Sequence, residues 1–397
     1  MKRTILLSAT VIAFLCPAWT RGEIVYEVID LGTLGGNTSW SFSINDAGQI
    51  VGNAANKQGD SHAVLFDATG AGNNVDLGTL GGDWGVAYSI NDAGQIVGEA
   101  QYTRGYYRAT LFDPTGQGHN IDLGTLGGVG SRAYCINDAG QIVGDAGCSH
   151  GEHGALYDPT GAGGNIDLGT LGGASGVPRS INERGQITGF AENSQGLTRA
   201  TLFDPTGAGG NIDLGTLGGP GSWAYCINDA GQIVGTAEDR PGAWGNATLF
   251  DPTGAGNNVD LGTLGGDASI ARSINNAGQI VGAARNSDGD WRACLFDPTG
   301  GGDNVDLTAA IDPASGWILL KEASDINASG CIVGRGVNLE GQVHGFLLVP
   351  RSLCAYTLAG DLNGDCRVDF ADLAVMLVNW LVDCRADPTN PACVPKQ

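Results

Sequence analysis

Basic residues are scarce in this chain. Lys and Arg number 20 against 42 Asp and Glu, which gives a formal net charge of −22 at pH 7. Because an anionic surface repels phosphate backbones, this balance excludes nucleic acid as a partner of the chain as a whole. We interpret the acidic surface as a source of solubility. The alternative is that some of the acidic turns hold cations.

Long apolar runs are also absent beyond the N-terminus. Lys2 and Arg3 precede an apolar run at 5–15, and small residues offer cleavage after Ala18 or Gly22. This is the pattern of a secretory signal peptide, assigned to residues 1–22. No later stretch approaches the roughly 18 apolar residues that span a bilayer, so no membrane span is expected. The sequence predicts a secreted, extracellular or cell-surface bacterial protein, in a compartment where disulfides persist.

Helical periodicity is missing from the central region, which consists instead of repeats. The heptapeptide DLGTLGG starts at Asp30, Asp76, Asp122, Asp167, Asp213 and Asp260, with a degenerate copy at Asp306. A SINDAGQIVG-like element starts at Ser43, Ser89, Cys135, Ser180, Cys226, Ser273 and Asp325. An element of the type RATLFD starts at His62, Arg108, His153, Arg199, Asn246, Arg292 and His344. Each element occurs seven times, at a period of about 46 residues.

Each repeat unit contains four short apolar segments, of the types AYSIN, QIVG, ATLFD and NIDLGTL, which are typical of β-strands. The NDAG between the first two segments places Gly late in a tight turn, and DPTGAG after the third begins a turn with Asp-Pro. Four strands per unit at this period are typical of a β-propeller blade. The predicted fold is therefore all-β, a seven-bladed β-propeller over residues 23–352.

The two ends of the repeat region differ from its middle. The first complete element is a lone fourth strand at 25–34, and the last unit has only three strands, around 324–327, 331–334 and 344–349. The N-terminal strand would complete the seventh blade, and such a 3+1 clasp would close the ring. An open solenoid is the alternative.

The repeats resemble a known family, the bacterial extracellular HAF repeats, named for a His-Ala-Phe motif. The resemblance covers residues 30–348 and rests on the DLGTLGG and SINxxGQIVG portions. The naming tripeptide is only partly kept, because Val64 follows His62-Ala63 and because Arg or Asn replaces the His in four units. The resemblance implies an exported repeat protein and no established reaction.

Near-identical units argue against catalysis in the repeats, because an acid, a base and a nucleophile each need a separate environment. The last residue of SIND is Asp46, Asp92, Asp138 or Asp229 in four units and Glu183, Asn276 or Ala328 in the others. Turn residues vary in this way, so we interpret the position as turn chemistry. The sequence predicts no catalytic residue and no enzyme.

The DLGTLGG motif is interpreted mainly as scaffolding. Leu31 and Leu34, with their counterparts, are expected to pack in the fourth strand. Gly35 and Gly36 are expected to form the joint into the next blade.

Histidines and aromatic residues are the remaining candidates for binding. His62, His153 and His344 start the third strand in three different units, and Cys148, His150 and His153 together have a spacing that could hold zinc. We interpret both sets as polar strand and loop residues. Aromatic side chains occupy the segments between strands that differ among units, at Trp40, Trp84, Trp223, Trp244, Trp291, Tyr102, Tyr106 and Tyr107. They either pack blade joints or contact a glycan or protein ligand.

The composition changes after Pro350, where residues 353–397 form a separate predicted module. A loop there carries oxygen ligands at EF-hand positions 1, 3, 5, 7, 9 and 12, namely Asp361, Asn363, Asp365, Arg367 (through its carbonyl), Asp369 and Asp372. These are hard oxygen donors, so the sequence predicts a Ca²⁺ site. A helix is expected from Phe370 to Val382, with its apolar residues along one side.

This loop and helix resemble type I dockerins, the modules by which secreted enzymes dock onto cohesins. A dockerin has two such loop-helix motifs and only one occurs here, so the resemblance implies calcium binding and leaves a cohesin-like or cell-surface partner open. Cys366 stands where the loop favours Gly. It is one of four tail cysteines, Cys354, Cys366, Cys384 and Cys393, which allow three disulfide pairings.

Together these features predict an exported, non-enzymatic binding scaffold that is tethered or sorted through a calcium-binding tail. One alternative is a carbohydrate-active hydrolase or lyase, which would need paired carboxylates at positions that differ among the units. Another is a structural component of a surface layer. The sequence does not identify the ligand.

Overall fold

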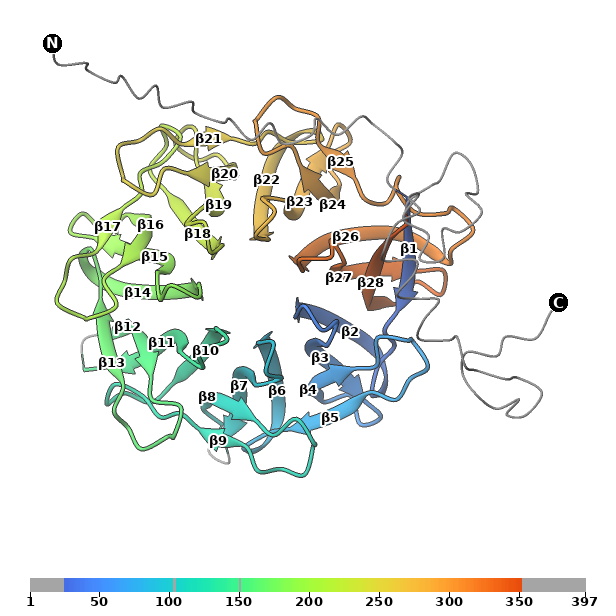
Figure 1. Ribbon diagram of the computed structural model, residues 1–397, viewed down its shortest axis with the longest axis horizontal. Coiled ribbons are helices and arrows are strands. Elements are labelled where there is room, and N and C mark those ends of the chain that lie inside the picture. Colours follow the sequence, from blue (N-terminus) through green and yellow to red (C-terminus); the bar gives the residue numbers. More distant parts are fainter. Residues whose placement is uncertain (1–24, 103–104, 150, 352–397) are drawn as a thin grey trace, which may run out of the picture. The chain divides into compact units, whose positions relative to one another are not determined.

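The structure is all-β in the part that can be described. The computed structural model describes residues 25–102, 105–149 and 151–351, and every regular element among them is a strand. Successive repeat units follow one another around a central opening, which is the arrangement of a β-propeller (Figure 1). The all-β prediction is confirmed. The predicted signal peptide and the predicted calcium module lie outside the described residues.

Each repeat unit supplies four strands in the same order. The first strands are β2 (Gly35–Ile44), β6 (Gly81–Ile90), β10 (Ser131–Ile136), β14 (Gly172–Ile181), β18 (Ser222–Ile227), β22 (Gly265–Ile274) and β26 (Trp317–Ile326). The second strands are β3 (Ile50–Asn56), β7 (Ile96–Tyr102), β11 (Ile142–Cys148), β15 (Ile187–Asn193), β19 (Ile233–Ala237), β23 (Ile280–Asn286) and β27 (Ile332–Asn338). The third strands are β4 (Ser61–Phe66), β8 (Tyr107–Phe112), β12 (Gly151–Tyr157), β16 (Thr198–Phe203), β20 (Asn246–Phe250), β24 (Trp291–Phe296) and β28 (Val343–Arg351). The fourth strands are β5 (Val75–Gly78), β9 (Ile121–Asp122), β13 (Ile166–Gly169), β17 (Ile212–Asp213), β21 (Val259–Asp260), β25 (Val305–Asp306) and β1 (Val25–Asp30).

Within a unit the strands pair antiparallel in chain order, as β18-β19-β20-β21 does. The first strand of each unit lies nearest the central opening (Figure 1). Because neighbouring strands run in opposite directions, the NDAG turns and the DPTGAG loops share one face, which we call the turn face. The loops between second and third strands lie on the opposite face, which we call the variable-loop face. The variable-loop face also carries the repeated DLGTLGG bends, since Leu34 and Gly35 pair with Asn56 at the end of β3.

The NDAG segments form the predicted turns. In the first unit, the Gly48 N–H donates to the Asn45 carbonyl at 3.0 Å, and Gly48 has φ of 78°, a conformation that side chains with a Cβ disfavour. The Asn45 side chain fixes the same turn by accepting the Gln49 N–H at 2.8 Å. The repeated sequence therefore determines the turn locally.

The Gly of QIVG is required by close packing rather than by a turn. A Cβ built on Gly52 would lie 1.9 Å from the carbonyl oxygen of Trp40, on the neighbouring first strand. Any larger residue at this position would push the two innermost strands apart.

The N-terminal strand completes the last unit, which agrees with the prediction made from the lone fourth strand in the sequence. β1 pairs with β28, and the Leu31 N–H donates to the Gly345 carbonyl at 3.1 Å. His344 Nδ1 lies 2.8 Å from Asp30 Oδ1, and although burial opposes the shift, the hydrogen bond from His344 lowers the pKa of Asp30. The two ends of the repeat region are thus joined by main-chain and side-chain bonds.

The DLGTLGG motif is scaffolding, although its boundaries differ from the prediction. The Leu of DLG is fully buried in every unit, as Leu31 is in the first. β1 already ends at Asp30, Leu34 forms only an isolated bridge to Asn56, and Gly35 is the first residue of β2 rather than part of a joint. The bend falls between Leu31 and Leu34 because Asp30 Oδ1 accepts the Gly32 N–H at 2.8 Å and turns the chain there.

Candidate functional site

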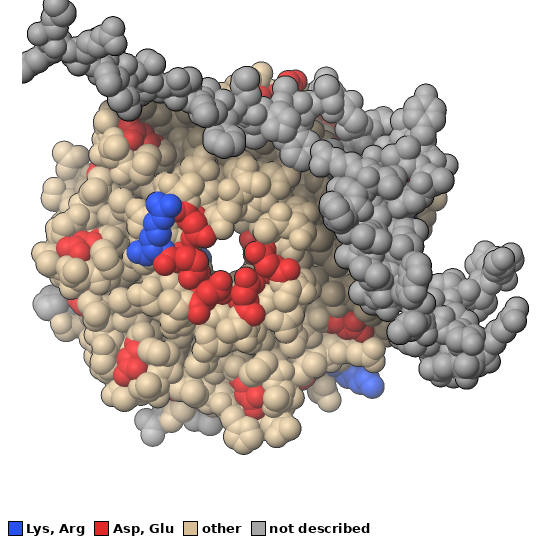
Figure 2. All heavy atoms as spheres, viewed as in Figure 1, with Lys and Arg blue, Asp and Glu red and all other residues tan. Residues whose placement is uncertain are grey.

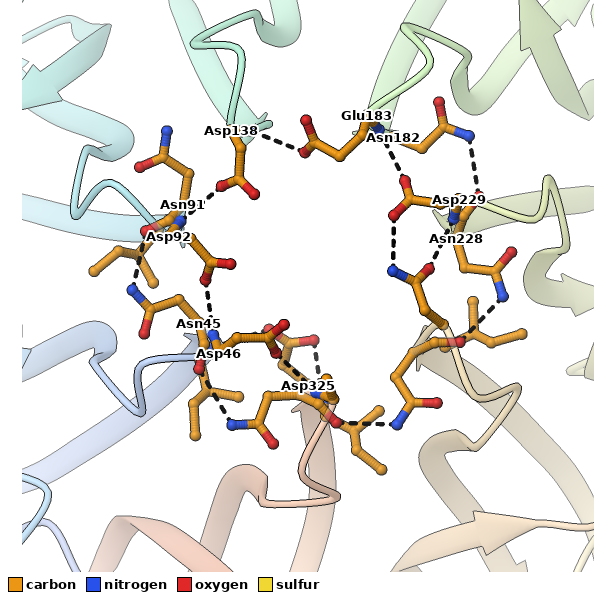
Figure 3. Close-up of a pocket in the computed structure, with 18 of the residues that line it drawn as sticks. Asn45, Asp46, Asn91, Asp92, Asp138, Asn182, Glu183, Asn228, Asp229 and Asp325 are labelled. Atoms are coloured by element: carbon orange, nitrogen blue, oxygen red, sulfur yellow. Dashed lines mark hydrogen bonds between the residues drawn. The ribbon is translucent and has the colours of Figure 1, made fainter. Parts of the chain in front are cut away.

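The repeated Asn of SIN forms a closed ring of hydrogen bonds at the turn face. Its Nδ2 donates to the carbonyl of the same Asn in the next unit, beginning with Asn45 to Asn91 at 3.0 Å and ending with Asn327 to Asn45 at 3.2 Å (Figure 3). The intermediate donors are Asn91, Asn137, Asn182, Asn228 and Asn275. All of these side chains are buried. The repeat therefore fixes the spacing between units.

A second ring, of acidic side chains, surrounds the mouth of the channel on this face. Figure 2 shows acidic side chains around an opening at the centre of the face. They line a cavity of about 240 Å³ and are Asp46, Asp92, Asp138, Glu183 and Asp229. The Asp46 N–H donates to Asp92 Oδ1 at 2.8 Å, and the same bond recurs from Asp92, Asp138 and Glu183 to the acid that follows (Figure 3). Each carboxylate thus accepts a main-chain hydrogen bond from its neighbour, as expected of a turn residue.

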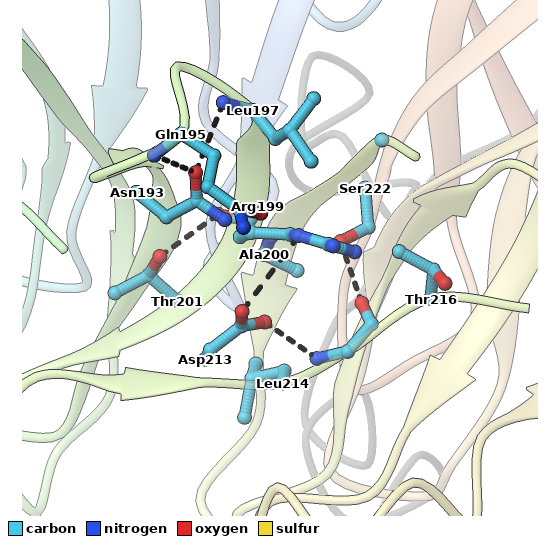
Figure 4. A network of polar contacts seen from close by, with 12 residues as sticks. Asn193, Gln195, Leu197, Arg199, Ala200, Thr201, Asp213, Leu214, Thr216 and Ser222 are labelled. Atoms are coloured by element: carbon cyan, nitrogen blue, oxygen red, sulfur yellow. Dashed lines mark hydrogen bonds and ion pairs between the residues drawn. The ribbon is translucent and has the colours of Figure 1, made fainter. Parts of the chain in front are cut away.

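The histidines that begin third strands pair with the Asp of DLGTLGG in their own unit. His62 Nδ1 lies 2.9 Å from Asp76, and this hydrogen bond raises the pKa of His62. Arg and Asn do the same elsewhere, as Arg199 does with Asp213 at 3.7 Å (Figure 4). In six of the seven units, this position therefore supplies a polar link between third and fourth strands; Arg108 makes no such pair. His153 pairs with Asp167 in this way, and His150 lies outside the described residues.

Predicted metal ligands fall outside the part of the chain that is described. These are Asp361, Asn363, Asp365, Arg367, Asp369 and Asp372, and Cys354, Cys366, Cys384 and Cys393 lie in the same tail. Within the described residues, no group of three or more His, Cys, Asp or Glu side chains is arranged to hold a metal ion.

Cysteines in the repeats are thiols in the structure. Cys135, Cys226, Cys294 and Cys331 form no disulfide, and burial raises the pKa of each thiol. Only Cys294 is fully buried. A buried thiol with a raised pKa is a weak nucleophile, so these residues contribute packing.

The innermost strands also carry residues that differ from unit to unit, beside the Ser or Cys of SIN. A β-bulge occurs there, seen as a register shift between Ala133 and Cys135. Tyr88 contacts Tyr134 with ring centroids 5.3 Å apart, and the Arg179 guanidinium lies 4.0 Å from the Tyr134 ring centroid. Rings and guanidinium groups therefore stack around part of the channel.

Two buried carboxylates meet at Arg132, beside this aromatic stack. Arg132 Nε donates to Glu99 Oε2 at 3.2 Å, and Nη1 donates to Asp145 Oδ2 at 3.2 Å. Tyr88 donates to the other oxygen of Glu99 at 2.5 Å. Glu99 and Asp145 are 4% and 2% exposed, and burial raises the pKa of both carboxyls. This acid pair lies at positions that differ among units.

A second ionic cluster forms where the ring closes. Glu322 accepts from Arg272 Nε at 2.7 Å and pairs with Arg335 at 2.7 Å. The Arg335 guanidinium lies 4.4 Å from the Trp40 ring centroid, so the last unit contacts the first. Although burial opposes the shift, the two guanidinium groups lower the pKa of Glu322.

Sequence reasoning missed both clusters, although a signal was present. The fourth residue of the IVG strand is Asn53, Glu99, Asp145, Phe190, Thr236, Ala283 or Arg335, which makes it one of the least repeated positions in otherwise uniform text. Acids occupy it only in two consecutive units. Comparing units column by column would have singled out the pair.

The prediction that the variable aromatic residues occupy segments between strands is wrong for six of the eight, which lie within strands. Only Tyr106 and Trp244 lie between strands. Trp244 is 70% exposed, and the Arg285 guanidinium lies between it and Trp291, at 5.3 and 5.2 Å from the two ring centroids. Arg285 is held in turn by Asp267 at 3.0 Å. The result is an outward-facing indole on an ordered support.

A second cavity, of about 190 Å³, opens on the variable-loop face between the second and third units. It is lined by Tyr106 and Tyr107 of the second unit and by Gly130, Arg132 and Glu152 of the third. Trp84 holds Tyr107 by an edge contact, with ring centroids 5.0 Å apart. This cavity therefore brings aromatic and charged side chains of two neighbouring units together.

No protein-family model matches the chain, and no curated protein matches it. Two solved structures are similar in fold. One is the WD40 beta propeller domain of Doa1, at 12% identity and a TM-score of 0.46, covering 80% of this chain and 96% of that one. The other is XC5397 from Xanthomonas campestris, a gluconolactonase, at 11% identity and a TM-score of 0.37, covering 82% of this chain and 95% of that one. Neither similarity bears on what this chain binds or catalyses.

No helix among the described residues is long and apolar enough to cross a membrane.

Proposed function

We propose that the protein is an exported binding scaffold, built on a seven-bladed β-propeller and tethered or sorted at the cell surface through a calcium-binding tail. The ligand, a glycan or a protein, binds on the variable-loop face. The observation that carries this proposal is the Trp244 platform, whose indole is 70% exposed and stacked on Arg285. The contact with Arg285 orders the indole before a ligand arrives, and covering a large aromatic ring with a ligand gains hydrophobic free energy.

Strand pairing supports a closed ring of seven blades. The first six units each contribute the same set of four strands, and β1 supplies the strand that the last unit lacks. The Asn ring passes from the last unit back to the first through Asn327 and Asn45. In a closed ring, every first strand has a neighbouring unit on both sides. The ring therefore holds the variable loops on a rigid frame.

The carboxylates support a binding protein rather than an enzyme. Those at the turn face accept main-chain hydrogen bonds from their neighbours, as Asp92 does from Asp46. Glu99 and Asp145 are nearly inaccessible and share the charge of Arg132. A general acid or base must reach the substrate, which the buried pair does not. The turn-face acids are accessible, but they repeat from unit to unit without the separate environments that an acid and a base need.

The binding proposal is tested with a glycan and peptide array, probed with residues 23–397. Replacement of the exposed indole by Trp244→Ala is expected to weaken the captured interaction at least tenfold, since an aromatic anchor contributes about 2 kcal/mol or more. Leu339→Ala is the control, because Leu339 is similarly exposed, at 67%, on the same face but contacts no such stack. Capture of nothing on either array, or equal affinity of the two variants, would contradict the proposal.

A carbohydrate-active hydrolase or lyase is the second candidate, favoured by one observation. Glu99 and Asp145 are paired carboxylates at positions that differ among units, which is the feature such an enzyme needs. Incubation of the protein with polysaccharides distinguishes the two proposals. Release of reducing ends that Glu99→Gln abolishes would establish the enzyme, and no release is expected for the scaffold.

The tail is expected to bind Ca²⁺ through the oxygen ligands of its loop. In calorimetry on residues 23–397, Asp361→Asn combined with Asp365→Asn is expected to weaken calcium binding at least tenfold, because two of the four carboxylates are lost. Asp387→Asn removes a charge from the same tail but from outside the loop, and it should leave the affinity unchanged. Absence of any calcium signal in the unaltered chain would refute the site.

A further inference from the structure

The cavity between the second and third units exists because Gly130 has no side chain. At the same place on the first strand, other units carry Thr38, Trp84 and Ser175, each paired with the start of the preceding third strand. The fifth unit also has a glycine there, Gly221, but the Trp223 ring comes within 2.7 Å of where its Cβ would be and fills the space. Arg132 stands at the position of Trp223 in the third unit. The cavity is therefore open because the third unit has both a glycine at position 130 and an arginine, rather than a tryptophan, at position 132.

The walls of this cavity are held in place before any ligand arrives. Tyr107 is fixed by the Trp84 edge at 5.0 Å, and Arg132 is fixed by Glu99 and Asp145 at 3.2 Å each. These two bonds use Nε and Nη1 of a guanidinium that has five N–H donors, and the Arg132 side chain is 36% exposed. Glu152 supplies acceptor oxygens on the same rim.

The chemistry of these groups matches a sugar ring. The C–H face of a pyranose stacks on an aromatic ring, and its neighbouring hydroxyls both donate and accept, which suits a guanidinium beside a carboxylate. Because Glu99 and Asp145 share the charge of Arg132 and Glu152 lies on the rim, the surroundings are not electropositive. An anionic sugar would meet carboxylates there without a free cation to balance it.

We propose that this cavity binds a neutral pyranose unit of an oligosaccharide. The inference rests on the proposed binding function and names the ligand class at one site of the variable-loop face. The Trp244 platform lies on other units, so the two sites are separable by mutation.

The test uses residues 23–397 and calorimetric titration with neutral hexasaccharides of glucose, mannose, xylose and galactose, alongside anionic hexagalacturonate. At least one neutral oligomer is expected to bind, and Gly130→Leu is expected to weaken that binding at least tenfold by filling the cavity. Gly130 does not have a positive φ, and its nearest neighbour to a new Cβ is the Tyr107 carbonyl oxygen at 3.8 Å, so the backbone accepts the change. Thr38→Leu places the same side chain at the equivalent site of the first unit and should leave binding unchanged.

Should Gly130→Leu disturb folding, Tyr106→Ala serves as the second variant, because Tyr106 is half exposed and lines the cavity. If a neutral oligosaccharide binds both variants as tightly as the unaltered protein, it does not bind in this cavity, although the scaffold proposal would stand. Stronger binding of hexagalacturonate, or binding of peptides alone on the arrays, would overturn the ligand class. Failure of every oligosaccharide to bind would overturn the inference, and failure on both arrays would also remove the proposed function.

Discussion

A chain that starts at Leu31 is expected to unfold at a clearly lower urea concentration than one that starts at Glu23, with a loss of at least about 3 kcal/mol in the free energy of unfolding. Removal of β1 deletes the buried Tyr26 side chain, its main-chain bond to Ala310 at 2.9 Å, and the Asp30 partner of His344. It also leaves the edge of β28 unpaired. Tryptophan fluorescence during urea titration gives the two midpoints.

Two point variants show whether the effect comes from ring closure. Leu31→Ala and Leu168→Ala truncate the same fully buried position in two units, at an expected cost of about 2–5 kcal/mol each. If β1 closes the ring, Leu31→Ala should destabilise the protein at least as much as Leu168→Ala. Equal midpoints for the chains starting at Glu23 and Leu31 would show that closure does not depend on this strand.

Replacement of Arg132 by Met is expected to cost about 3–5 kcal/mol near pH 8, because it leaves Glu99 and Asp145 buried without their cation. The loss should be smaller near pH 5. Burial raises the folded-state pKa of both carboxyls above the unfolded value, and the charge of Arg132 opposes that rise, so its replacement raises both folded-state pKa values further. The folded variant therefore holds more protons than the unfolded chain between the unfolded and the folded pKa. Stability is therefore present below the unfolded pKa and is lost as pH rises through the folded pKa. Urea midpoints measured across this range give the slope.

Two controls separate buried charge from simple truncation. Adding Glu99→Gln and Asp145→Asn to the Arg132→Met chain should recover much of the loss and remove the pH dependence, because no charge is then buried alone. Arg240→Met breaks an exposed pair with Asp239 and is expected to change stability by less than about 1 kcal/mol. A loss in Arg132→Met that is the same at both pH values would rule out unpaired carboxylates as its cause.

Local sequence was sufficient for the turns and for the closing strand. NDAG specifies its turn through Asn45 and Gly48, whose interactions lie within five residues of one another. The lone DLGTLGG at Asp30 predicted a partner in the last unit because strand order alone shows which unit lacks a fourth strand. The calcium loop, the signal peptide and the resemblance to HAF repeats stay predictions, and the first two lie outside the described residues.

Side chains that meet across units could not be paired from the sequence. The order of variable residues along the chain does not show that Glu99, Arg132 and Asp145 converge, because they lie on the second strand of one unit and the first two strands of the next. These three side chains come into contact only because the innermost strands of the two units pack closely against each other. The acids of the turn face were correctly interpreted as turn residues, but their bonds to the next unit arise from the same approach.

The sequence by itself determined what repeats, namely the strands, their turns and the order in which they pair, because these depend on residues close together in the chain. Only the tertiary structure decided where the exceptions to the repeat lie. Gly130, Arg132 and Tyr107 form a cavity, and Trp244 stacks on Arg285, because strands of adjacent units bring them into contact. A repeat fixes the frame through local hydrogen bonding, whereas a binding surface comes from side-chain contacts between units that the frame places side by side.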